Sequence, residues 1–236
     1  MANRRLLTGL GLVAVTAFGL AVAVWQVSRA RCFVLAGDVT CRVETIQPLV
    51  ALTFDDGPTD LGVDAVLPIL ERHGARATFF LVGEAVDRRP HLAARIKAAG
   101  HELANHSYTH RQMLARPASW YDSEIARTEA ALARAGGGSG LFRPPYGKKL
   151  WGLPQATRRA GLTMVMIDVE EPTTTDPAEY ARQVVADARP GSILLLHAMY
   201  GANQTARDAL PLVLEGLRAK GLQPVSVGEL IAAGAC

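Results

Sequence analysis

From residue 49 onward, the chain alternates short apolar runs rich in β-forming residues with longer stretches of helical periodicity. This alternation narrows the available folds more than any other feature, because strands separated by helices form parallel sheets. The predicted strands are 49–54, 77–82, 101–105, 141–143, 163–168, 192–197 and 223–226, and the predicted helices are 64–72, 92–99, 119–134, 178–188 and 207–220. The pattern predicts an α/β fold, a distorted (β/α) barrel of about seven strands that is closed or incomplete. A doubly wound open sheet fits the same pattern and stays as the alternative.

The length and charge limit the number of domains and the class of partner. A chain of 236 residues, 49% of them hydrophobic, has room for one domain with a full core. We expect a signal anchor at 1–30, a short extension at 31–48 and a catalytic domain at 49–236. The net charge of +3 is small and the basic residues are scattered, so a nucleic-acid partner is not expected.

The N-terminal segment has the pattern of a membrane anchor. Arg4 and Arg5 precede an uncharged stretch at 6–25, which as a helix would be about 30 Å long and so match a bilayer core. Residues 27–31 form a poor cleavage site, so we expect an uncleaved transmembrane helix with the catalytic domain outside the cytoplasm, periplasmic or extracellular. A cleaved signal peptide, which would give a secreted protein, is the alternative.

The cysteines also fit an exported protein. Cys32 and Cys41 lie nine positions apart on either side of Gly37 and Asp38, so a disulfide would close a small hairpin. The sequence alone does not decide whether this pair forms. Cys236, the last residue, has no assigned role.

Polar residues lie where predicted strands end, which is where β/α folds collect their catalytic groups. The residues in these positions are Asp55, Asp56, His106, Arg143, Asp168 and His197. So many coincidences favour a functional site over a set of unrelated turns and core residues.

One carboxylate and two histidines have the composition of a catalytic zinc site. Asp55 and Asp56 follow the first strand in an Asp-Asp-Gly-Pro sequence, which as an isolated motif is also ordinary turn chemistry. His106 and His110 are four residues apart and would face the same side of a helical turn. Three protein ligands with a fourth position left for water are typical of catalytic zinc. The second Asp would then be free to act as a general base.

Each of two further residues has both a structural and a functional interpretation. Arg143, in an Arg-Pro-Pro-Tyr-Gly segment, would keep the basic carboxylate ionised, or it would belong simply to a rigid loop. His197, at the end of an apolar strand, would be an acid–base group or a histidine packed in the core.

The motifs at 53–58, 106–110, 143–147 and 195–197 together resemble the polysaccharide deacetylase family, the NodB-like carbohydrate esterases. The resemblance covers roughly residues 49–230. It implies that Asp56, His106 and His110 bind a divalent metal, which we take as Zn²⁺ with Co²⁺ or Ni²⁺ as alternatives.

The resemblance also implies catalytic roles for other residues. Asp55 would be the general base, and Arg143 would orient it. The backbone N–H of Tyr146 would stabilise the oxyanion, and His197 would be the general acid.

The family's usual Asp-Trp pair after the fifth strand is altered here. The segment at 167–174 has no tryptophan, so Asp168 is the first candidate for the carboxylate that supports His197, with Glu170 or Glu171 as the second. The family's usual Asp after the acid histidine is also missing, and Ala198, Met199 and Tyr200 stand in its place, so Tyr200 is expected to line the pocket instead. The residues predicted to contact the sugar are Pro145, Tyr146, Leu196 and Tyr200.

The resulting hypothesis is a metal-dependent enzyme that removes acetyl groups from N-acetylglucosamine-type sugars in a cell-wall or extracellular glycan. A lipid-linked sugar or a non-sugar amide is the alternative substrate. A non-catalytic glycan-binding domain is a third reading.

Overall fold

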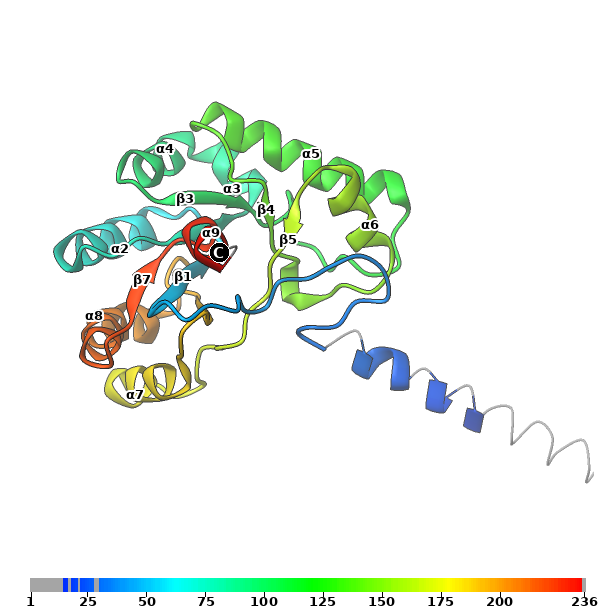
Figure 1. The fold of residues 1–236 in the computed structure, drawn as a ribbon. Coiled ribbons are helices and arrows are strands. Elements are labelled where there is room, and N and C mark those ends of the chain that lie inside the picture. The colour runs from blue at the N-terminus through cyan, green and yellow to red at the C-terminus, as the bar shows by residue number, and fades with distance from the viewer. Residues whose placement is uncertain (1–14, 17, 21, 28–29, 235–236) are drawn as a thin grey trace, which may run out of the picture.

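The computed structural model describes residues 15–16, 18–20, 22–27 and 30–234 (Figure 1). Among these residues, no helix is both long enough and apolar enough to cross a bilayer. The greater part of the predicted anchor at 6–25, namely residues 6–14, 17 and 21, lies outside the described residues, as does Cys236.

The body alternates parallel strands with helices, as the sequence pattern predicts (Figure 1). The strands are β1 (Leu49–Asp55), β2 (Thr78–Leu81), β3 (Glu102–Asn105), β4 (Leu141–Phe142), β5 (Thr163–Met164), β6 (Ile193–Leu196) and β7 (Gln223–Val225). The helices are α2 (Asp60–His73), α3 (Gly83–Arg88), α4 (Pro90–Ala98), α5 (Ala118–Arg134), α6 (Gly152–Arg159), α7 (Pro177–Asp187), α8 (Gln204–Ala219) and α9 (Val227–Gly234), with a 3₁₀ turn η1 (Pro145–Gly147).

The sheet is a distorted and incomplete barrel. Its strand order is β5-β4-β3-β2-β1-β6, and β7 pairs with the first half of β1. The segment that follows β5 reaches the other edge of the sheet, where Val169 forms a parallel bridge with Leu194 of β6. The expected distorted barrel therefore describes the sheet better than a doubly wound open sheet.

The fifth strand is shorter than predicted. The prediction extends it to Asp168, but it ends at Met164 because the chain then changes partners. Val165 pairs with Thr40 of the N-terminal extension, and Val169 pairs with β6. These contacts come from segments distant in sequence, so local periodicity does not reveal them.

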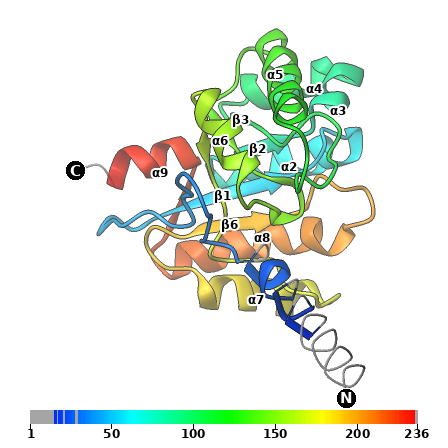
Figure 2. The same ribbon diagram turned by 90° about the vertical axis from the view of Figure 1, so that its right-hand side faces the viewer.

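Side chains divide the core into two layers by strand alternation. Leu194 and Leu196 of β6 pack with the residues between sheet and helices, whereas Ile193 and Leu195 point into the barrel. Helices α4 and α5 lie on one side of the strands, and α7 and α8 on the other (Figure 2). The helices that the sequence did not predict, α3, α6 and α9, are short, with six or eight residues each.

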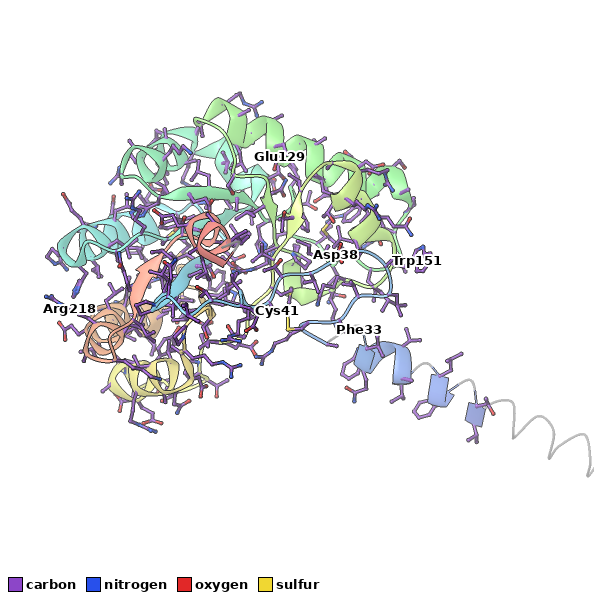
Figure 3. All side chains as sticks on the ribbon, in the orientation of Figure 1. Phe33, Asp38, Cys41, Glu129, Trp151 and Arg218 are labelled. Atoms are coloured by element: carbon purple, nitrogen blue, oxygen red, sulfur yellow. A yellow bond between two sulfur atoms is a disulfide. The ribbon has the colours of Figure 1, made fainter. Side chains whose placement is uncertain are left out.

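The two cysteines of the extension form a disulfide, Cys32–Cys41, near the point where the N-terminal segment meets the body (Figure 3). The predicted pairing is confirmed, and the loop that it closes contains no strand among residues 32–41. Thr40 bridges Val165 and Arg42 bridges Ser192, so the extension pairs with the barrel rather than with itself.

Candidate active site and metal centre

The predicted site residues gather at one edge of the barrel. Asp55 is the last residue of β1 and Asp56 follows it, while His106, Arg143 and His197 each come directly after β3, β4 and β6. Because all these strands are parallel, their carboxyl ends lie at the same edge.

Asp56, His106 and His110 lie close enough to share one cation, with donor atoms within 4.8 Å of one another. The Asp56 Oδ1 atom is 3.2 Å from His110 Nε2 and 3.8 Å from His106 Nε2. Tetrahedral ligands at about 2.1 Å from a zinc ion would be separated by about 3.4 Å. The donor set therefore fits a first-row divalent ion in both chemistry and spacing.

A backbone contact sets the orientation of His106. Its Nδ1 atom is 2.8 Å from the carbonyl oxygen of Arg143, and a carbonyl can only accept. Nδ1 therefore carries the hydrogen, and Nε2 presents its lone pair toward Asp56. Metal-binding histidines are commonly oriented by such a second hydrogen bond.

His110 reaches the site through an irregular loop, so the expectation of a helical turn is wrong. Ser107 has φ 61° and His110 has φ 55°, both in the left-handed region. Among the described non-glycine residues, five have positive φ, and apart from Ala115 these are Asp56, Ser107, His110 and Tyr146. Such conformations cost about 1–3 kcal/mol each and persist at functional sites where surrounding contacts hold them.

Asp55 is buried and paired. Its Oδ1 atom accepts a 2.5 Å hydrogen bond from Arg143 Nη1, which also donates to Thr53 Oγ1 at 2.7 Å. Burial acts to raise the pKa of Asp55, but the charges of Arg143 and His197 and the hydrogen bond from Arg143 outweigh it and hold the pKa below its usual value. Asp55 is therefore an anion at neutral pH. Thr53, two residues earlier on the same strand face, is a contact that strand alternation could have predicted.

His197 is supported by Glu171 and not by Asp168, which was the first candidate. Its Nδ1 atom is 2.7 Å from Glu171 Oε1, and its backbone N–H donates to Glu171 Oε2 at 3.1 Å. Asp168 instead accepts from Ser192 Oγ and from the Ile193 N–H. The reason is that the chain pairs with β6 at Val169, which turns Asp168 toward the start of that strand.

The contacts of His197 favour its protonated form. Burial acts to lower the pKa of His197, but the hydrogen bond with Glu171 and the charge of Asp55 raise it to about 9. Glu171 also accepts from the Tyr180 hydroxyl at 2.8 Å and from Asn203 Nδ2 at 3.3 Å. Tyr180 and Asn203 carry no motif, and sequence reasoning missed both.

A pocket of about 720 Å³ opens beside the proposed metal ligands. Asp56, His110 and His197 line it, together with Tyr146 and Tyr200. The two tyrosines are 61% and 58% exposed, so their rings are free to contact a ligand. The Tyr146 ring also lies 5.0 Å from that of His110.

Two predicted substrate contacts lie elsewhere. Leu196 is fully buried between the sheet and the helices, because the alternation of β6 directs Leu195 rather than Leu196 into the barrel. Pro145 is buried and is not among the residues that line the pocket. Both predictions are wrong for the described conformation.

Comparison with known proteins gives consistent similarities. Residues 42–165 match the family model described as polysaccharide deacetylase. The chain is 37% identical over 186 residues to a bifunctional xylanase/deacetylase of Pseudobutyrivibrio xylanivorans, covering 78% of this chain and 30% of that protein. It is 32% identical to a peptidoglycan-N-acetylglucosamine deacetylase of Bacillus cereus, covering 77% of this chain and 67% of that protein.

A solved structure is similar along most of its length. A peptidoglycan N-acetylglucosamine deacetylase in complex with 4-naphthalen-1-yl-N-oxidanyl-benzamide is 30% identical, with a TM-score of 0.77. The similarity covers 82% of this chain and 92% of that one.

Proposed function

This chain belongs to the polysaccharide deacetylase family, and from that premise we propose that it hydrolyses the N-acetyl group of N-acetylglucosamine-type sugars and releases acetate. The proposed substrate is a cell-wall or extracellular glycan. The observation that carries the proposal is the approach of Asp56, His106 and His110 to within 4.8 Å, in a pocket that His197 also lines.

Zn²⁺ is the metal that we propose, with Co²⁺ and Ni²⁺ as alternatives that suit the same nitrogen and oxygen donors. When bound, such a metal polarises the carbonyl under attack and lowers the pKa of water toward neutrality. Asp56, His106 and His110 would hold it, and the hydrogen bond from His106 Nδ1 to Arg143 keeps one ligand in the correct tautomer.

Asp55 and His197 supply the proton transfers in this proposal. Asp55 is ionised beside Arg143 and would accept a proton from the attacking water. His197 is protonated beside Glu171 and would give its proton to the amine as the carbon–nitrogen bond breaks. An amine is a poor leaving group unless it is protonated, so loss of either residue should cost about 10²- to 10⁴-fold in rate. The Tyr146 backbone N–H is the proposed oxyanion donor.

The aromatic side chains of the pocket wall favour a sugar as the substrate. The wall differs from the family pattern in one respect. Tyr146 and Tyr200 offer exposed aromatic rings, and no tryptophan lines the pocket among the described residues. This difference is the observation that keeps a lipid-linked sugar or a non-sugar amide as the second candidate substrate.

The proposed location is outside the cytoplasm, anchored to the membrane by the apolar segment at 6–25. The Cys32–Cys41 disulfide supports export, because disulfides persist in oxidising compartments. Fractionation of cells, with protease applied to intact spheroplasts, tests this. A catalytic domain that resists external protease would contradict the proposal.

Acetate release by the purified protein tests the function. The protein is freed of metal with a chelator and assayed with and without Zn²⁺ on chitooligosaccharides, peptidoglycan fragments and lipid-linked sugars. Release should require the metal and should be lost in His110→Ala and Asp55→Asn. His73→Ala, which changes an exposed histidine at the end of α2, is the matched control. Release that is unchanged by the first two substitutions would refute the proposal, and the ranking of substrates decides between the two candidates.

A further inference from the structure

A buried carboxylate lies beneath the loop that joins His106 to His110. Glu124 comes from α5 and is only 3% exposed. Within the part of the chain that the structure describes, no lysine or arginine forms an ion pair with it. A buried carboxylate without a cation is unfavourable unless hydrogen-bond donors compensate it.

The donors that compensate Glu124 all belong to the loop at 107–110. Its Oε2 atom accepts from the backbone N–H of Tyr108 at 3.1 Å and of Thr109 at 2.8 Å. The Thr109 hydroxyl, at 3.0 Å from both carboxylate oxygens, is the third donor. Hydrogen bonds from backbone N–H groups to an ionised carboxylate are short and strong, so this side chain fixes the middle of the loop.

The loop needs such support because two of its residues adopt unfavourable backbone conformations. Ser107 and His110 have positive φ, which non-glycine residues rarely adopt. The Ser107 N–H donates to Asn105 Oδ1 at 2.9 Å, and the Ser107 Oγ atom accepts from the His110 N–H at 3.1 Å. Asn105 in turn donates to Glu129 of α5, which is labelled in Figure 3.

The other side of the loop packs against α3. The N–H groups of Gly83 and Glu84 donate to the carbonyls of Ser107 and Tyr108. A Cβ at Gly83 would lie 2.7 Å from the Tyr108 ring, so only glycine permits this approach. The carbonyls of the loop are therefore bound by α3, whereas its central N–H groups are bound by Glu124.

We propose that Glu124 is a positioning residue that holds the loop at 107–110 in the conformation that lets His110 share a metal ion with Asp56 and His106. It does not touch the ion itself. The inference rests on one part of the proposed function, namely that Asp56, His106 and His110 bind a metal ion. Removing residues that orient metal ligands typically weakens metal binding by about 10- to 100-fold, and we expect that range for Glu124→Gln. The glutamine keeps the size but replaces the carboxylate by a neutral amide, whose oxygen accepts weaker hydrogen bonds from the loop N–H groups.

The test measures Zn²⁺ affinity of the metal-free full chain by competition with a chromophoric chelator. Asp122→Asn is the matched control, because Asp122 lies on the same helix but is exposed and pairs with Arg159. Glu124→Gln should bind Zn²⁺ about 10- to 100-fold more weakly, while Asp122→Asn should match the wild type. The turnover number of Glu124→Gln at saturating Zn²⁺ should return to near the wild-type value, which a general loss of structure would not allow.

A second variant serves if Glu124→Gln does not fold. Thr109→Val removes one donor to the same carboxylate with little change in volume, and it should weaken Zn²⁺ binding by about 2- to 12-fold. Zn²⁺ affinity of the folded variants equal to that of the wild type would overturn the inference but leave the proposed function intact. A wild-type protein that neither binds Zn²⁺ nor releases acetate would refute the proposed function as well.

Discussion

Replacing Glu171 with glutamine should move the alkaline limit of activity. The Glu171 carboxylate is 2.7 Å from His197 Nδ1, and this contact opposes the effect of burial on the imidazole. The pKa of His197 is raised from 6.5 to about 9. The protonated form, and the stability that the pair contributes, are therefore fully present below about pH 6.5 and lost as the pH rises through about 9.

The size of the effect depends on pH. If the pKa of His197 returns to 6.5 in Glu171→Gln, about 3% of the imidazole is protonated at pH 8, compared with about 90% in the wild type. A reaction that needs the protonated form should therefore slow about 30-fold at pH 8. At pH 6 the same calculation predicts a loss of less than about twofold.

The assay is the turnover number for acetate release between pH 5.5 and 10, at saturating metal and substrate. Glu170→Gln is the control, because Glu170 is exposed and pairs with Arg31 rather than with His197. Its alkaline limb should coincide with that of the wild type. Coinciding limbs for Glu171→Gln and the wild type would refute the reasoning, because Glu171 would then not control the protonation of His197.

Four other substitutions have expected outcomes. Arg143→Met leaves the buried Asp55 carboxylate unpaired, so the free energy of unfolding in urea should fall by about 3–5 kcal/mol. The acid limb of the activity profile should move to higher pH, because the cation that lowers the pKa of Asp55 is gone. An unmoved acid limb would contradict this. Leu196→Ala should reduce the free energy of unfolding by about 2–5 kcal/mol without changing KM. Tyr200→Ala should raise KM with little loss of stability. The reverse result would show that Leu196 lines the pocket. Cys32→Ser should lower stability by roughly 2–4 kcal/mol, measured by thermal unfolding, and an unchanged melting temperature would argue against a structural role for the disulfide.

The strands and most of the site could be predicted from local pattern. Buried parallel strands are nearly continuous apolar runs, and β1, β2 and β6 appear as such in the sequence. The polar residues that follow them lie together at one edge because the strands are parallel. For this reason, Asp55, Asp56, His106 and His197 were all identifiable before the fold was known.

The wrong predictions share a cause. No helical turn carries His110, Asp168 does not support His197, and Leu196 does not line the pocket. In each case the outcome depends on a partner from another segment: α3 and α5 for the loop of His110, β6 for Asp168, and the strand register for Leu196. No local pattern encodes these contacts.

The sequence by itself determined the α/β class, the number of strands and the chemistry of the donors, because periodicity and residue type are local properties. Only the tertiary structure decided that Glu171 is the partner of His197, and that Glu124 supports the metal-ligand loop. Both carboxylates lie outside the recognisable motifs, and each acts through hydrogen bonds to residues 15–26 positions away. Such bonds form only when folding brings separate elements together and excludes the water that would otherwise compete for the same donors.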